Sequence, residues 1–219
     1  MNKVLSVFFF CLFIPFGHSQ TLAVLKYNGG GDWYSNPTAL GNLSSFCNKA
    51  LQTQLTTQAA TVSLSDDQLF AYPFIHMTGH GNVVFSPEEL DRLRTYLDAG
   101  GFVHIDDNYG MDEFIRPILM SLFPDSPLEA VPNSHPIFNL AFEMSNGLPK
   151  IHEHNAEKPQ AFAIRRNGRI VLFYSFESDL GDGWEDAEVH NDSEEVRTLA
   201  LKMGANLVAY AFSSAKDEI

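Results

Sequence analysis

Short apolar runs alternate along this chain with segments of helical spacing, and this alternation limits the fold more than any other feature. The apolar runs have the length of buried strands and lie at residues 22–27, 60–64, 72–81, which ends in a glycine turn, and 102–106. Segments 38–55, 87–98 and 111–123 have the spacing of amphipathic helices, the last with an interruption near Pro117. Such an order is typical of an α/β domain with a mainly parallel central sheet.

The later part of the chain has a different pattern. Two strand-like runs within residues 160–176 meet at Asn167-Gly168, which predicts an antiparallel hairpin in the C-terminal half. A final amphipathic helix is expected over 193–212. With 219 residues in all and no linker, we expect one domain over residues 20–219.

The first nineteen residues have the pattern of a signal peptide. Lys3 precedes an apolar run at 4–16, and Gly17 and Ser19 are small residues before a cut at Gln20. The alternative is an uncleaved N-terminal anchor. The run is shorter than the roughly 20 residues of a typical spanning helix, and we expect no membrane span in the mature chain. The expected location is the bacterial periplasm or the outside of the cell.

Charge and cysteine content narrow the classes of partner. The formal net charge is −13, which argues against nucleic acid and against an anionic membrane surface as partners. Removal of the signal peptide leaves Cys47 as the single cysteine, so neither an internal disulfide nor a thiolate-rich metal site is expected.

Polar, glycine-flanked segments follow several of the predicted strands. In open parallel sheets, ligands bind outside the carboxyl ends of the strands, so these segments should meet at one rim. Of the two consecutive acids in this set, one should face the site and the other should cap the following turn. The residues expected at the rim are Trp33, His80, Asn82, Asp106, Asp107, Asn108, Tyr109, Asp182, Trp184, Glu185, Asp186 and His190.

The segment Ser178–Glu195 combines two features. Its oxygen ligands do not alternate as in a calcium-binding EF-hand loop. Gly181 and Gly183 are expected to allow a tight turn after the strand, which predicts a site loop. Asp192 and Ser193 are expected to cap the final helix.

Two histidines form an H-x-H pair in the sequence KIHEHN. On an extended strand, His152 and His154 would face the same side, which suits two imidazoles on one divalent metal such as zinc. A carboxylate such as Asp106 or Asp182 would be the third ligand. The alternative is a pair of hydrogen-bonded structural or substrate-binding histidines.

Several long segments of the chain resemble one bacterial family. They are HMTGHGNVVFSPEELDRLRTYLDAGGFVHIDDNYGMDEF, PKIHEHN, SDLGDGWEDAEVHND and LKMGANLVAYA. The family is domain of unknown function 4159, which is placed in the class I glutamine amidotransferase-like superfamily. The resemblance implies a flavodoxin-like three-layer α/β sandwich. Active glutamine amidotransferases have a nucleophilic cysteine where this chain has Asp106-Asp107-Asn108, so the resemblance implies that it is not a glutaminase.

Two functions are compatible with these patterns. The chain is a non-catalytic module that binds a small polar ligand or a cell-envelope protein at the rim, or it is a hydrolase that uses the same groups. In the second case His80, Asp106, Asp107 and His190 would supply acid–base groups, around a divalent metal held by His152 and His154. Trp33, Tyr109 and Trp184 would stack on a ring-bearing ligand.

Overall fold

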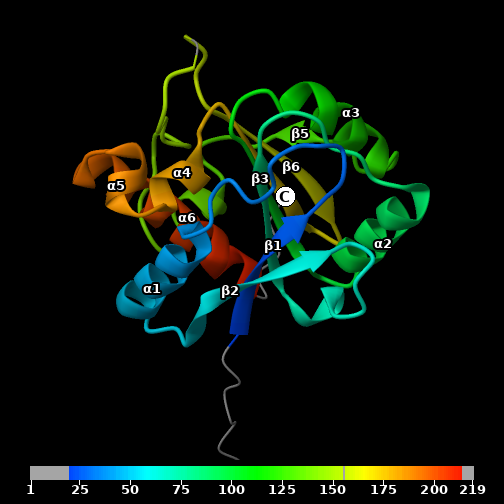
Figure 1. The fold of residues 1–219 in the computed structure, drawn as a ribbon, viewed down its shortest axis with the longest axis horizontal. Coiled ribbons are helices and arrows are strands. Elements are labelled where there is room, and N and C mark those ends of the chain that lie inside the picture. The colour runs from blue at the N-terminus through cyan, green and yellow to red at the C-terminus, as the bar shows by residue number, and fades with distance from the viewer. Residues whose placement is uncertain (1–19, 155, 214–219) are drawn as a thin grey trace, which may run out of the picture.

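Residues 20–154 and 156–213 are described by a computed structural model, and their strands form one mixed seven-stranded sheet (Figure 1). The predicted signal peptide lies outside the described residues. The sheet order is β2-β1-β3-β4-β7-β6-β5. The strands are β1 (Gln20–Lys26), β2 (Leu55–Ser63), β3 (Phe74–Gly79), β4 (Phe102–Asp107), β5 (Glu129–Ala130), β6 (Gln160–Arg166) and β7 (Arg169–Phe176).

The expectation of a mainly parallel α/β sheet is confirmed. Strands β2, β1, β3, β4 and β7 pair in parallel, whereas β7, β6 and β5 pair antiparallel. The predicted hairpin joins β6 to β7. Asn167 and Gly168 both have positive φ there, 54° and 78°, as a two-residue turn of the hairpin type requires.

Helices cover both faces of the sheet. Adjacent residues of β1 show the division, because Leu22 belongs to one buried apolar cluster and Ala23 to the other. Helices α1, α4 and α6 pack together on the first face, and α2 and α3 contribute to the second cluster (Figure 1). The α-helices are α1 (Ala39–Leu51), α2 (Pro87–Asp98), α3 (Asp112–Leu122), α4 (Leu180–Trp184), α5 (Ala187–His190) and α6 (Glu194–Phe212).

Local sequence sets the start of α2. Ser86 and Glu89 form a reciprocal capping box at the start of α2. The interruption expected near Pro117 is wrong, since α3 continues through it. The buried Ile115 and Leu119 anchor the helix on either side of this exposed proline. Within the described part of the chain, none of the helices has the length and apolar character needed to cross a membrane.

Candidate functional site

Three histidines and three aspartates gather beyond the carboxyl end of β7. They come from the loop before β6 and from the segment between β7 and α6, which contains the short helices α4 and α5. The loop of the H-x-H pair is neither strand nor helix, so the extended strand assumed for this pair is not formed. We call the group the His/Asp cluster, and its members are His152, His154, Asp179, Asp182, His190 and Asp192.

The centre of the cluster is a row of close nitrogen–oxygen contacts. His154 Nε2 lies 2.6 Å from Asp179 Oδ2. His152 Nδ1 lies 2.9 Å from Asp182 Oδ2 and 3.9 Å from Asp179 Oδ2. His190 Nε2 lies 3.7 Å from the other oxygen of Asp182. Imidazoles and carboxylates therefore alternate along the row.

Two further contacts fix the orientation of the imidazoles. The Nε2 atom of His152 lies 3.2 Å from both carboxylate oxygens of Asp192. The ring of Tyr109 stacks on His154 with centroids 4.7 Å apart. Tyr109 has a φ of +79°, an uncommon value for an aromatic residue. The sequence places this strained residue directly after Asn108, so its ring reaches the cluster from the end of β4.

Buried amides hold Asp182 from inside the fold. Its Oδ1 accepts hydrogen bonds from Asn36 Nδ2 at 2.7 Å and from Asn108 Nδ2 at 3.1 Å. The Asn36 carbonyl oxygen in turn accepts from Asn108 and from the Thr78 hydroxyl, each at 2.9 Å. Asn36 thus connects the ends of β3 and β4 to the start of α4.

A second buried polar chain supports α4 from the sheet. Asp106 accepts hydrogen bonds from the Gly181 backbone N–H at 2.6 Å and from the Ser175 hydroxyl. Ser175 Oγ also lies 2.9 Å from His104 Nε2, and His104 Nδ1 lies 3.0 Å from His76 Nδ1. A Cβ on Gly181 would meet the Asp106 carboxylate at 3.2 Å. Glycine is needed here for close approach inside a helix, and not for the tight turn expected from the sequence.

Burial and hydrogen bonds set the protonation of the cluster. The hydrogen bond to Asp182, opposed by burial, raises the pKa of His152 to about 9. Burial, with the nearby charge of Asp182, raises the pKa of Asp179 to about 7. Burial alone would raise the pKa of Asp182, but hydrogen bonds from His152 and Asn36 lower it below its ordinary value. At neutral pH the cluster therefore holds an imidazolium beside an ionised carboxylate.

Two overlapping groups of donors have the geometry of a metal site. His152, His154 and Asp179 form one, and His152, Asp182 and His190 form the other, with the ligand atoms of each group within 4.8 Å of one another. Asp179 is completely buried, and its Oδ1 has no hydrogen-bond partner among the described residues. An ionised, buried oxygen without a partner is costly unless a cation is nearby.

Some of the rim residues predicted from the sequence lie apart from the cluster. His80 pairs instead with Asp32, with its Nδ1 3.0 Å from Asp32 Oδ2. Trp33 packs edge-on against Tyr34, and the backbone carbonyl of Asn82 accepts a hydrogen bond from Gly31. These contacts form around the loop after β1, and no described contact joins them to the His/Asp cluster.

The two consecutive acids at the end of β4 are both buried and have different partners. Asp107 accepts a hydrogen bond from the Met111 N–H at 2.8 Å, which makes it the cap of the following turn. Asp106 is the one directed toward α4, and its side chain is 0% exposed. Both oxygens of Asp106 are engaged, one by Ser175 and one by Gly181, so in this structure it positions Gly181.

Three residues of the predicted site loop make contacts within the fold, with α1 and α6. Trp184 is 0% exposed and donates its indole N–H to the Ala200 carbonyl. Glu185 is buried, and its carboxylate caps the start of α1 by accepting hydrogen bonds from the backbone N–H groups of Thr38 and Ala39. Asp186 accepts from Asn42 of α1. These contacts form because α4 packs against both α1 and α6.

Sequence patterns missed three residues that the site uses. Asp179 lies three residues after the end of β7 with a φ of 58°, and an aspartate near a strand end is the signal that could have revealed it. Asp192 was assigned to the helix cap, but Ser193 alone caps α6, through the Val196 N–H. Asn36 lies 146 residues from its partner Asp182, and no local pattern could reveal that contact.

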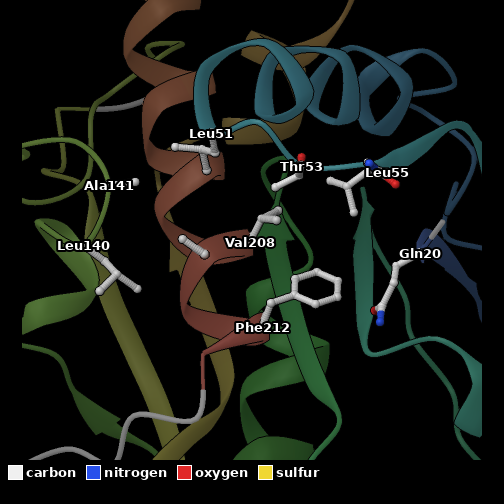
Figure 2. Close-up of a pocket in the computed structure, with 10 residues that line it drawn as sticks. Gln20, Leu51, Thr53, Leu55, Leu140, Ala141, Val208 and Phe212 are labelled. Atoms are coloured by element: carbon white, nitrogen blue, oxygen red, sulfur yellow. The ribbon is translucent and has the colours of Figure 1, made fainter. Parts of the chain in front are cut away.

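An apolar hollow lies at the amino ends of β1 and β2, whereas the His/Asp cluster lies beyond the carboxyl end of β7. Its volume is about 530 Å³, and Figure 2 shows Leu55, Val208 and Phe212 around it. None of its lining residues is ionisable, so it offers no acid–base or metal chemistry.

Comparison with known proteins gives a family and no named relative. A search of curated proteins finds no match to the chain. The family described as Domain of unknown function (DUF4159) matches residues 21–212, which include every member of the His/Asp cluster. The chain therefore belongs to the DUF4159 family.

Proposed function

We propose that the protein binds a divalent transition metal in the His/Asp cluster and, through it, a small polar ligand at the carboxyl ends of the strands. The observation that carries this proposal is the convergence of His152, His154 and Asp179 around the completely buried carboxylate of Asp179. Two imidazoles and a carboxylate are the donor set that zinc takes in sites with an open fourth position. The fourth position would hold the ligand or a water molecule.

The contact between His152 and Asp192 supports the same proposal. A metal-bound histidine usually donates its second ring N–H to a carboxylate, which fixes the tautomer and makes the ring a better ligand. Asp192 lies at Nε2 of His152, which leaves Nδ1 directed to Asp179 and Asp182. In the metal-free protein a proton on Nδ1 takes the place of the cation, and metal binding would release it.

The fold relationship also enters as a proposal. The parallel strands β2, β1, β3, β4 and β7 follow one another in the order of the flavodoxin-like doubly wound sheet, which supports a flavodoxin-like, glutamine amidotransferase-like origin. We infer that glutaminase activity is absent. Cys47, the free cysteine among the described residues, is buried in the core, and burial raises its pKa to about 12. A catalytic thiolate would need a lowered pKa.

Metal-dependent hydrolysis is the second candidate function. It is favoured by the position of Asp182 and His190 beside the first three donors, because a bound water there would have acid–base groups within reach. We further propose that the chain is exported, to the periplasm or beyond, with residues 1–19 as its signal. In that location a cell-envelope protein is the alternative partner to a small ligand.

Elemental analysis of the purified protein tests the metal. Wild type is expected to retain a divalent metal through dialysis, and the His152→Ala/His154→Ala variant is expected to lose it. His80→Ala is the matched control, since this histidine pairs with Asp32 outside the cluster. Equal metal content in wild type and the double variant would contradict the proposal. A screen with ester, amide, glycoside and phosphate substrates then separates hydrolysis from binding alone.

A further inference from the structure

The carboxylate of Asp182 has one oxygen near each of two different imidazoles. Its Oδ2 lies 2.9 Å from His152 Nδ1, and its Oδ1 lies 3.7 Å from His190 Nε2. A carboxylate in this position can give one oxygen to each of two cations. We propose that the His/Asp cluster is a two-metal centre bridged by Asp182, and that it binds a phosphate group; this inference rests on the metal site proposed above.

The first ion would occupy the inner part of the cluster. His152, His154 and Asp179 supply three donors that all lie within 4.8 Å of one another. The partnerless Oδ1 of the buried Asp179 is a further oxygen on this side. When the second ion is also present, Oδ2 of Asp182 would add to these donors and a phosphate oxygen would take a fifth position, so His190 remains outside this ion's coordination sphere.

The second ion would lie toward the surface, between Asp182 and His190. Asn108 donates from inside the fold to Oδ1 of Asp182, the oxygen near His190, and its own amide oxygen is buried without a hydrogen-bond partner among the described residues. Water would complete this coordination, because the His190 side chain is 30% exposed. The cluster thus has more donors than one tetrahedral ion can use, and a bridging carboxylate distributes them over two ions about 3.5–4 Å apart.

Charge selects the ligand. The cluster has three aspartates, so one divalent ion leaves its net charge negative when they are ionised, whereas two ions make it positive. The chain as a whole is acidic and attracts no anion by its general field. Two metal ions would create a local anion site, and a phosphate group can offer one oxygen to each ion.

The number of bound ions tests the inference separately from the proposed function. Apoprotein prepared with a chelator is loaded with Mn²⁺ or Zn²⁺, and ions per chain are counted after gel filtration. Two ions are expected for wild type and for His80→Ala, and one for His190→Ala. Electron paramagnetic resonance of the Mn²⁺ form should show a spin-coupled pair in wild type and isolated ions in His190→Ala.

The outcomes separate clearly. One ion in wild type would overturn the two-metal centre and leave the metal site standing, whereas no bound ion would overturn both.

Calorimetry with inorganic phosphate adds a second arm, in which wild type with two ions binds and His190→Ala binds at least tenfold more weakly. Equal phosphate binding by these two proteins would refute the anion site. Circular dichroism confirms folding of the variants, and Asp182→Asn should lose the spin coupling if the carboxylate is the bridge.

Discussion

His152 and Asp182 are joined by a 2.9 Å contact between Nδ1 and Oδ2, and this contact favours the charged form of both residues. It is the main cause of the raised His152 pKa of about 9. Against the effect of burial, the hydrogen bonds from His152 and the Asn36 amide lower the pKa of Asp182, so the pair is a fixed imidazolium–carboxylate contact at neutral pH.

We expect Asp182→Asn to lower the pKa of His152 from about 9 toward the ordinary histidine value near 6.5. The substitution removes the hydrogen bond to a charged acceptor and the favourable charge together. Nuclear magnetic resonance titration of the metal-free protein, following the imidazole signals, measures the shift. Asp192→Asn is the matched comparison and should lower the pKa less, because its charge is a smaller cause. A larger shift for Asp192→Asn would reverse this ranking.

Metal affinity should increase with pH. A divalent ion must displace the proton of His152, with a pKa of about 9, and below pH 7 also that of Asp179, with a pKa of about 7. Linkage then predicts an affinity gain of about tenfold per pH unit between pH 7 and 9, and a steeper gain below pH 7. Competition with a chelator of known affinity at pH 6, 7, 8 and 9 measures it. Affinity that does not vary over this range would mean that these residues are not the ligands.

Asp106→Asn should stabilise the metal-free protein at alkaline pH. Burial raises the pKa of Asp106 to about 8, so the native state holds a proton that the unfolded chain, with a pKa near 3.9, has lost. The stability that this proton contributes is complete below pH 4 and is lost as pH rises through about 8. Asparagine cannot ionise and can still accept from Gly181, so the stability gain should be larger at pH 8 than at pH 5. Thermal unfolding in the presence of a chelator measures it, and an equal effect at both pH values would contradict the assignment.

Glu185→Ala should destabilise the fold without removing the metal. Its carboxylate caps the start of α1 through the N–H groups of Thr38 and Ala39, and the loss of such a cap costs about 1–2 kcal/mol. Urea unfolding measures the change. Glu188→Ala, at an exposed position of α5, should remain within about 0.5 kcal/mol of wild type. Loss of metal from folded Glu185→Ala would contradict this prediction and would mean that Glu185 takes part in metal binding.

The sequence reveals local features of this protein well and distant ones poorly. The capping box at Ser86 and the turn at Asn167-Gly168 are set by residues within a few positions of each other, and the predicted turn is confirmed. The residues around the predicted rim separate into two groups because the final contacts are non-local. Tryptophan is a residue type that often lines pockets, which is why Trp184 was predicted at the rim. Gly183 instead allows α4 to approach Ala200 of α6 so closely that the indole is enclosed.

Candidate site residues could be predicted from residue type and strand ends, but their partners could not. His152 and His154 belong to the cluster, and the spacing alone suggested that they act together. Asp179 and Asp192 lie 25 and 40 residues from the histidines that they contact, so only the packing of α4 and α6 brings them together. The flavodoxin-like relationship and the export signal stay predictions.

The bond between Asn36 and Asp182 has a consequence for the order of events in biosynthesis. Its two ends are 146 residues apart, and the second end follows the last strand of the sheet. A ribosome-bound chain that has emerged only as far as β7 lacks the acid to which Asn36 donates. The cluster cannot therefore seed folding in the manner of a zinc finger, and the metal proposed for it would bind late, after the sheet has assembled.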